Sequence, residues 1–452
     1  MSADPNFSVD RVVVSSNEHW LYLDFWPLIA YAYRTLWLHV RPTLVFLTER
    51  FESDPFVVAL RRHGDVVLVR PVHGIPQAAQ CKLARYWYAA SRPPEEVVYI
   101  DDIDQIPIDR EWHEERVQKR KSGTMLLVGA EVYGGDEKGQ TPASMMTAEA
   151  LVYRDLFNPQ DLLFPDFLRS LADRGGRHRD VYSRVNHEGM ESTTDAERLP
   201  GRSLFSDEAL IVRLREERPV PVTHAERGYE PGKDTIDRSF MGSFDSKKLI
   251  DGGYVAAHAP RPYLEHRAVV DSILDYIRRF YKGGSIPEVP RATAGADPDM
   301  RFNATGISRA AFEWICATIE PGSSILEFGS GHVSTNYLSR YYWMCSIEHD
   351  LAYVNIYPSH YIYAPPFDGW YDLDMLRFGL DHRRLRGRKF SLTIVDGPTD
   401  VGMMQFASTV GSLRFDLSAP ILVSGRKVGG TVVALEMETG RVAQIYDGFA
   451  VV

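Results

Sequence analysis

The sequence contains few cysteines and lacks a long uninterrupted apolar run. Cys81, Cys316 and Cys345 are the only three in 452 residues, and their odd number and wide spacing exclude a disulfide framework and an ordinary zinc site. The most apolar window, residues 20–40, is interrupted by charged residues and a proline, which excludes an ordinary membrane span. The first residues lack the basic and apolar parts of a signal peptide. We therefore expect a cytoplasmic protein without a transmembrane segment, for which peripheral membrane contact stays open.

Basic residues are also outnumbered, with 51 lysines and arginines against 61 acidic residues and a formal net charge of −10. This balance argues against nucleic acid as the main partner, because phosphate neutralisation requires a basic face. The length exceeds the usual size of one hydrophobic core, so two domains are expected. A stretch rich in glycine and proline at residues 282–300 predicts a linker between domains at 1–281 and 301–452.

The most informative motif lies in the second domain, where a short apolar strand runs into an acidic, glycine-rich turn. This segment spans Ser324–Ser334 and contains Glu327, Gly329 and Gly331. Both glycines lack a Cβ and can take positive φ, so the backbone can approach a ligand closely. The motif predicts a cofactor site.

Two further strands of the same domain are followed by acidic residues. A strand at 344–347 ends on Glu348, and a strand at 392–395 ends on Asp396. In an open doubly wound sheet, ligands bind at the carboxyl ends of the parallel strands. The three carboxylates are therefore expected on one edge, where Glu348 could accept both hydroxyls of a ribose.

A dinucleotide site is the competing interpretation of this motif. It requires a third glycine at the helix start for the pyrophosphate, and this chain has Val333 or Thr335 there instead. The acidic Glu327 before the first glycine also disfavours a pyrophosphate and suits a ligand with an ammonium and a sulfonium. A Rossmann-like domain that has lost its ligand stays open as a further alternative.

The spacing of these residues resembles that of class I S-adenosylmethionine-dependent methyltransferases. The resemblance implies a Rossmann-like domain in which Glu327, Gly329 and Gly331 line the methionine and ribose, while Glu348 binds the ribose hydroxyls. In sugar O-methyltransferases the acid in the position of Asp396 lies near the substrate, and we expect it to remove the acceptor proton.

Two details of that comparison stay open. His349 and His332 are alternatives to Asp396 as the proton acceptor. The chain departs from related sequences at its fifth strand, where residues 421–426 lack a paired acid, which argues against metal-dependent methyl transfer.

The first half alternates predicted strands and helices, as in an α/β domain. We expect strands at 11–15, 43–47, 66–69 and 96–100, and helices at 24–38 and 77–91. The last of these strands ends at Asp102 and Asp104, two carboxylates that can hold a divalent cation, and such a cation can neutralise a diphosphate leaving group. The helix before it carries Lys82 and Arg85 one turn apart, which could bind a nucleotide diphosphate.

The strand and acidic pair resemble the D-x-D motif of GT-A glycosyltransferases, over roughly residues 9–276. The resemblance implies a Mn²⁺ or Mg²⁺ ion, a nucleotide-sugar donor and strands near 127–133 and 144–148 that build the acceptor side. Asp207 and Glu208 then occupy the place of a catalytic base, and His258 that of a late histidine that returns to the metal.

Each of these residues also has a structural interpretation. An acidic pair at a helix start, such as Asp207 and Glu208, commonly serves as an N-cap. His258 beside prolines fits a loop histidine without a ligand, and Lys82 and Arg85 fit surface charges. D-x-D pairs also occur at 297–299 and 372–374, but neither follows a buried strand.

Together the two resemblances predict a bifunctional α/β enzyme of glycan assembly. The first domain would transfer a sugar from a nucleotide donor to an oligosaccharide or polysaccharide acceptor, and the second would O-methylate a sugar hydroxyl with S-adenosylmethionine. Two alternatives stay open: a methyltransferase whose first domain only binds glycan, and a non-catalytic structural partner in a polysaccharide assembly complex.

Overall fold

The computed structural model of the protein divides into two compact units, one mainly from residues 1–291 and the other mainly from residues 292–452. The structure describes residues 8–73, 75–129, 144–175, 207–226, 233–237, 244–292, 306–350, 353–354, 356–364, 388–396, 419–424, 428–447 and 449–452, and a few isolated positions between 300 and 385. No helix in these ranges is long and apolar enough to cross a membrane.

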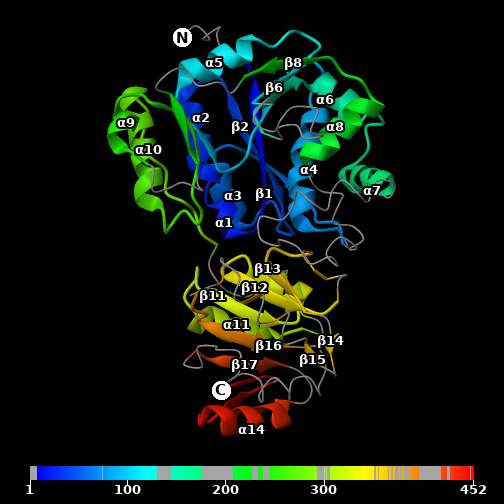
Figure 1. Ribbon diagram of the computed structural model, residues 1–452, viewed down its shortest axis with the longest axis vertical. Coiled ribbons are helices and arrows are strands. Elements are labelled where there is room, and N and C mark those ends of the chain that lie inside the picture. Colours follow the sequence, from blue (N-terminus) through cyan, green and yellow to red (C-terminus); the bar gives the residue numbers. More distant parts are fainter. Residues whose placement is uncertain are drawn as a thin grey trace. The chain divides into compact units, whose positions relative to one another are not determined.

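The first unit, called unit 1 below, is built on a seven-stranded sheet (Figure 1). Its strands lie in the order β3 (Asp65–Val69), β2 (Arg41–Leu47), β1 (Arg11–Asn17), β4 (Val97–Ile100), β7 (Met146–Glu149), β6 (Met125–Val128) and β8 (Val222–Ala225). The first four are parallel, and β7 is antiparallel to both β4 and β6. Because β4 joins β1 on the side opposite β2, the strand order reverses between β1 and β4. Ligands of such sheets bind at this reversal, at the carboxyl ends of the strands.

A small second sheet lies beside the first in unit 1. It consists of β5 (Gln105–Pro107), β10 (Tyr254–His258) and β9 (Asp234–Asp237), with β10 in the centre. β10 runs antiparallel to β5 and parallel to β9. The turn between β4 and β5 therefore joins the two sheets.

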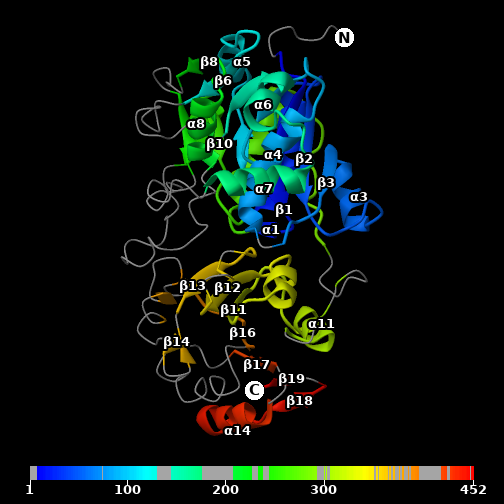
Figure 2. The same cartoon turned by 90° about the vertical axis from the view of Figure 1, so that its right-hand side faces the viewer.

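Helices cover both faces of the large sheet in unit 1 (Figure 1). One side carries α2 (Trp26–Leu36), α9 (Ser246–Ile250) and α10 (Arg267–Phe280), and the other carries α4 (Gln77–Ala90), α6 (Ala150–Phe157), α7 (Phe164–Gly175) and α8 (Asp207–Glu217). The remaining helices are α1 (Trp20–Leu23), α3 (Pro55–Arg61), which lies beside the edge strand β3 (Figure 2), and α5 (Arg110–Gln118). Coverage on both faces explains why β1 and β2 are almost continuously buried.

Local signals explain several element boundaries. Asp54 caps α3, since its carboxylate accepts a hydrogen bond of 2.7 Å from the Phe56 backbone N–H. The single helix expected over residues 24–38 is instead split into α1 and α2, because Asp24 ends α1 and Pro27 lies in the first turn of α2. Of the strands expected at 127–133 and 144–148, β6 and β7 are displaced by about two residues, and positions 130–143 lie outside the described residues.

The segment that follows α10 packs against unit 1. The Tyr31 hydroxyl donates a hydrogen bond of 2.8 Å to the Gly284 carbonyl, and Arg291 pairs with the buried Asp24 at 2.6 Å. Ile286 and Val289 contact the hydrophobic core between these two points. Residues 283–291 are therefore part of unit 1, although we expected a linker over 282–300.

The second unit, called unit 2 below, contains its own doubly wound sheet. The strand order is β13 (His360–Tyr363), β12 (Trp343–Glu348), β11 (Ser324–Phe328), β16 (Leu392–Val395), β17 (Ile421–Ser424), β19 (Phe449–Val451) and β18 (Gln444–Tyr446). The first five strands are parallel, and β19 is antiparallel to its neighbours β17 and β18. The order reverses between β11 and β16, which is the position expected to bind a ligand.

The remaining described elements of unit 2 surround this sheet. They are α11 (Arg309–Thr318), the π-helical turn η6 (His332–Asn336), the short pair β14 (Pro366–Phe367) and β15 (Trp370–Tyr371), and α14 (Val428–Thr439). Ser308 caps α11 by accepting a hydrogen bond of 3.1 Å from the Ala311 backbone N–H. α14 packs against β17 and β19 (Figure 2).

Candidate functional sites

The turn after β4 lies at the strand reversal of unit 1 and is held by a buried aspartate. Asp101 accepts a hydrogen bond of 2.6 Å from the Tyr33 hydroxyl and one of 3.0 Å from the Asp102 backbone N–H. Burial raises the pKa of Asp101 well above its ordinary value. Asp101 therefore fixes the turn, and Asp102 and Asp104 present their carboxylates from it.

Asp102, Asp104 and His258 come together as predicted. One ligand atom from each residue lies within 4.8 Å of the other two. His258 Nε2 is 3.4 Å from Asp104 Oδ1, and the Ala259 backbone N–H donates a 2.7 Å hydrogen bond to the Asp104 carbonyl, which ties the end of β10 to the turn. Two carboxylates with one imidazole form a donor set that a divalent cation can use, and carboxylates favour Mg²⁺ or Mn²⁺.

Arg85 supports this cluster from α4. Its guanidinium donates to Asp102 Oδ1 at 2.7 Å and to the Asp101 carbonyl at 2.9 Å, and the side chain is only 4% exposed. The sequence predicts contact with a nucleotide diphosphate, whereas the observed contacts hold the turn. Lys82, one turn earlier, is half-buried, and diphosphate binding by either residue stays a prediction.

Arg261 is a further cation of this site that sequence reasoning missed. Its Nε lies 3.2 Å from Asp104 Oδ2, and its guanidinium lies 4.2 Å above the Tyr22 ring. Burial and the nearby Arg261 charge lower the pKa of His19 to about 3, so this histidine is neutral. A cation three residues after the expected metal ligand His258 was the available signal for Arg261.

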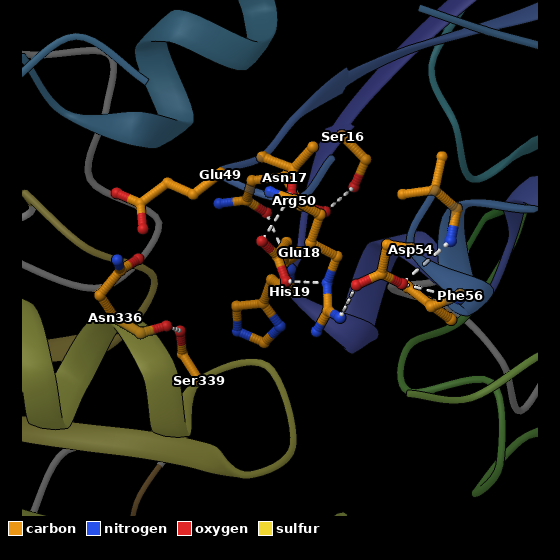
Figure 3. A network of polar contacts seen from close by, with 12 residues as sticks. Ser16, Asn17, Glu18, His19, Glu49, Arg50, Asp54, Phe56, Asn336 and Ser339 are labelled. Atoms are coloured by element: carbon orange, nitrogen blue, oxygen red, sulfur yellow. Dashed lines mark hydrogen bonds and ion pairs between the residues drawn. The ribbon is translucent and has the colours of Figure 1, made fainter. Parts of the chain in front are cut away.

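A second set of charges holds the ends of β1 and β2 (Figure 3). Arg50 donates to Glu18 at 2.7 Å and to Asp54 at 2.8 Å, and the Thr48 hydroxyl donates to Glu18 at 2.6 Å. All three charged side chains are at most 13% exposed. This network joins the β1 loop, the β2 loop and the start of α3.

The predicted base of unit 1 is only partly described. Asp207 and Glu208 are the first two residues of α8, and their side chains lie outside the described residues. Their position at a helix start agrees with the sequence expectation. A catalytic role for either residue stays a prediction.

The glycine-rich turn of unit 2 follows β11 and uses its two glycines differently. Gly329 has a φ of 85°, which is in the left-handed region that favours glycine. Gly331 has a φ of −155°, so the expectation of positive φ was wrong at this position. Its extended backbone leads directly into the π-helical turn η6.

Glu327 is fully buried beneath this turn. Its Oε2 accepts hydrogen bonds from the Thr335 hydroxyl at 2.6 Å and the Ser346 hydroxyl at 3.0 Å. Its Oε1 accepts no hydrogen bond from the described residues. Burial raises the pKa of Glu327 to about 7, although these hydroxyl groups oppose the rise. The open carboxylate oxygen suits a ligand that carries a proton donor, such as an ammonium group.

Glu348 ends β12, and both of its oxygens are engaged. One oxygen accepts from the Ser330 backbone N–H at 2.8 Å and the Ser330 hydroxyl at 2.6 Å. The other accepts from the backbone N–H groups of His349 at 2.8 Å and Asp350 at 3.0 Å. Glu348 therefore ties the turn after β11 to the end of β12. A ribose would have to replace the Ser330 hydroxyl contact, and ribose binding by Glu348 stays a prediction.

Asp396 follows β16, next to the strand reversal of unit 2. Burial raises the pKa of Asp396 to about 8, the negative charge of Glu327 adds to this shift, and a hydrogen bond from Ser424 partly offsets it. At neutral pH this carboxyl group therefore holds a proton. The alternatives lie elsewhere: His349 Nδ1 is 3.1 Å from Glu348, and His332 begins η6 beside Tyr337.

No protein-family profile matches the chain, and no curated protein matches its sequence. Three solved structures share its α/β character. The galactosyltransferase LgtC, solved with donor and acceptor sugar analogues, is 12% identical, with 62% of this chain and 98% of that chain covered and a TM-score of 0.35. The glycosyltransferase GlyE of Streptococcus pneumoniae TIGR4 is 10% identical, with 92% and 90% covered and a TM-score of 0.30.

The third is the glucosyl-3-phosphoglycerate synthase of Mycobacterium tuberculosis, solved with Mn²⁺, UDP and glucosyl-3-phosphoglycerate. It is 12% identical, with 64% of this chain and 83% of that chain covered and a TM-score of 0.25. Because all three TM-scores lie below 0.5, a functional assignment depends on the geometry of the two sites.

Proposed function

We propose that unit 1 is a metal-dependent glycosyltransferase that uses a nucleotide-sugar donor. The observation that carries this proposal is the cluster of Asp102, Asp104 and His258 at the strand reversal, where their ligand atoms converge within 4.8 Å. These residues would hold a Mn²⁺ or Mg²⁺ ion. When bound, the ion would neutralise the negative charge that develops on a diphosphate leaving group.

The surrounding side chains of unit 1 have complementary tasks. Arg85 orients Asp102, and Arg261 places a positive charge beside Asp104, where it adds to the attraction for phosphate oxygens. Tyr22 covers the guanidinium face of Arg261 and limits its movement. Asp207 or Glu208 is the proposed base that removes a proton from the acceptor hydroxyl of an oligosaccharide or polysaccharide.

Calorimetric titration of UDP, GDP and dTDP with Mn²⁺ tests this proposal. We expect one nucleotide to bind the wild type, and Asp104→Asn or His258→Ala to weaken binding by about a hundredfold, because each removes a ligand of the cation. Asp166→Asn on the exposed face of α7 is the matched control. Binding that is independent of Mn²⁺, or equal in all variants, would contradict the proposal.

We further propose that unit 2 binds S-adenosylmethionine and O-methylates a sugar of the same glycan. The strand reversal between β11 and β16, with Glu327, Gly329 and Asp396 beside it, supports this. S-adenosylmethionine supplies a methyl group activated by a sulfonium. Glu327 would accept a hydrogen bond from its ammonium group through the open Oε1, and Gly329 would allow close approach of the backbone.

Asp396 is the proposed proton acceptor in methyl transfer. Since its pKa is raised to about 8, it must first lose a proton to serve as a base. Methyl transfer should therefore accelerate as the pH rises from 7 towards 9. The end of β17 carries Ser424, so the described strand ends do not provide the paired acid of a metal-dependent methyltransferase.

Binding of S-adenosylhomocysteine tests the second activity. We expect Glu327→Gln to weaken binding by about tenfold, because a carboxylate bonds an ammonium more strongly than an amide does. Glu320→Gln, at an exposed position of the same unit, is the control. If S-adenosylhomocysteine binds and no nucleotide does, unit 1 is a glycan-binding module. If neither binds, both proposed activities are wrong.

A further inference from the structure

Gln105 is a buried amide next to the acidic cluster of unit 1. It is the first residue of β5, follows Asp104 directly and is 2% exposed. Its backbone N–H donates a 3.0 Å hydrogen bond to the Asp102 carbonyl. Gln105 is therefore held by the same turn that presents Asp102 and Asp104.

The sheet register places Gln105 beside His258. The two residues are direct partners in the antiparallel pair of β5 and β10, and such partners carry their side chains on the same face, with Cβ atoms about 5 Å apart. The next residue, Ile106, is fully buried in the hydrophobic core. Side chains alternate along a strand, so Gln105 points away from that part of the core, towards the face that carries His258.

The amide nitrogen of Gln105 has no hydrogen-bond acceptor among the described residues of the chain. A buried donor left in this state costs about 1–3 kcal/mol, and such groups are normally satisfied by a water or a ligand. An apolar side chain would avoid that cost. The amide is thus placed where a ligand oxygen can complete it.

We infer that Gln105 donates a hydrogen bond to a hydroxyl of the sugar in the nucleotide-sugar donor, and so contributes to sugar specificity. The inference rests on the proposed glycosyl transfer in unit 1. The cation and Arg261 serve the diphosphate. The sugar is attached to that diphosphate, so its hydroxyls come next to the residues that flank the cluster. A neutral amide suits a hydroxyl, since both groups donate and accept.

The test compares nucleotides with and without the sugar. Wild type, Gln105→Met and Gln105→Glu are titrated with UDP, UDP-glucose, UDP-galactose and UDP-N-acetylglucosamine in the presence of Mn²⁺, and with the GDP and dTDP series if UDP does not bind. We expect both variants to keep the affinity for the nucleoside diphosphate within about twofold. The preferred nucleotide sugar should bind about tenfold more weakly, as expected for one lost hydrogen bond of about 1.4 kcal/mol.

Three results are distinguishable. If the wild type binds no nucleotide with Mn²⁺, the proposed function of unit 1 fails and this inference fails with it. If nucleotides bind but both variants keep the wild-type ratio of sugar to nucleoside diphosphate affinity, the inference alone is overturned, and Gln105 is a structural residue. Gln105→Glu keeps the shape of the side chain, so it provides the answer if Gln105→Met does not fold. Unchanged affinity for the nucleoside diphosphate shows that each variant is folded.

Discussion

The two units place acidic residues at the same topological position and give them different electrostatic surroundings. In unit 1, Arg85 and Arg261 contact Asp102 and Asp104, so these carboxylates have positively charged partners. In unit 2, burial raises the pKa of Glu327 to about 7 and that of Asp396 to about 8, and no basic side chain of the described residues contributes to either shift. The first arrangement keeps carboxylates ionised for a divalent cation, whereas the second retains protons until a cationic ligand or a change of pH removes them.

The largest expected effect is a dependence of unit 2 stability on pH. Since the pKa of Asp396 is raised from 3.8 to about 8, the folded state binds its proton more tightly than the unfolded state. The stabilisation is complete below pH 3.8 and is lost as the pH rises towards 8, by up to about 1.4 kcal/mol per pH unit. Hydrogen exchange of the β16 amides at pH 5 and pH 8 measures this loss of unfolding free energy.

Asp396→Asn should remove most of that slope, because the amide does not titrate. Glu327→Gln should remove a smaller part, since the pKa of Glu327 is raised from 4.5 only to about 7. The β1 amides of unit 1 serve as the internal reference. A slope that persists in the double variant would contradict the assignment.

A smaller effect is expected when unit 1 loses a positive charge. Arg50→Met leaves Glu18 and Asp54 without their cation in a site where all three side chains are at most 13% exposed. The unfolding free energy should fall by about 3 kcal/mol, because buried charges are left uncompensated. Chemical denaturation at pH 7 measures this change.

Arg169→Met is the matched control for that experiment. Arg169 and Asp166 also form an ion pair, at 2.7 Å, but both side chains are more than half exposed. The change in unfolding free energy should stay within about 0.5 kcal/mol. Equal effects of the two substitutions would show that burial does not distinguish these pairs.

The smallest expected effect concerns the backbone of the turn after β11. Gly329→Ala should lower the unfolding free energy of unit 2 by about 1–2 kcal/mol, because alanine is strained at a φ of 85°. Gly331→Ala should be nearly neutral, since its φ is −155° and a Cβ would meet the Ser334 hydroxyl only at 3.5 Å. Hydrogen exchange of the β11 amides compares the two variants, and a larger loss from Gly331→Ala would contradict this account.

The parallel strands could be predicted from the sequence with good accuracy. β1, β2, β11 and β16 are short apolar runs because helices or loops cover both faces of their sheets. The acidic residues that follow such strands were equally visible, and so was the approach of His258 to Asp102 and Asp104, although only through a family resemblance.

The hydrogen-bond partners of these acids could not be predicted. Arg85 turns inward to Asp102, and Arg261 reaches Asp104 from a distant part of the chain. Glu348 is saturated by the backbone of Ser330 and its own neighbours. Strand periodicity locates the end of a strand, but the choice of partner depends on contacts between segments far apart in the sequence, and it decides whether an acid binds a ligand or holds a turn.

The attachment of residues 283–291 to unit 1 has a consequence for the movement of a shared substrate. A tether that could begin only after Arg291 loses about half of the 19 residues expected at 282–300. Effective concentration rises roughly as the −3/2 power of tether length, so a halving raises it about threefold. A glycan released by one unit would then meet the other more often than a new molecule from solution would, which favours sequential modification of the same chain end.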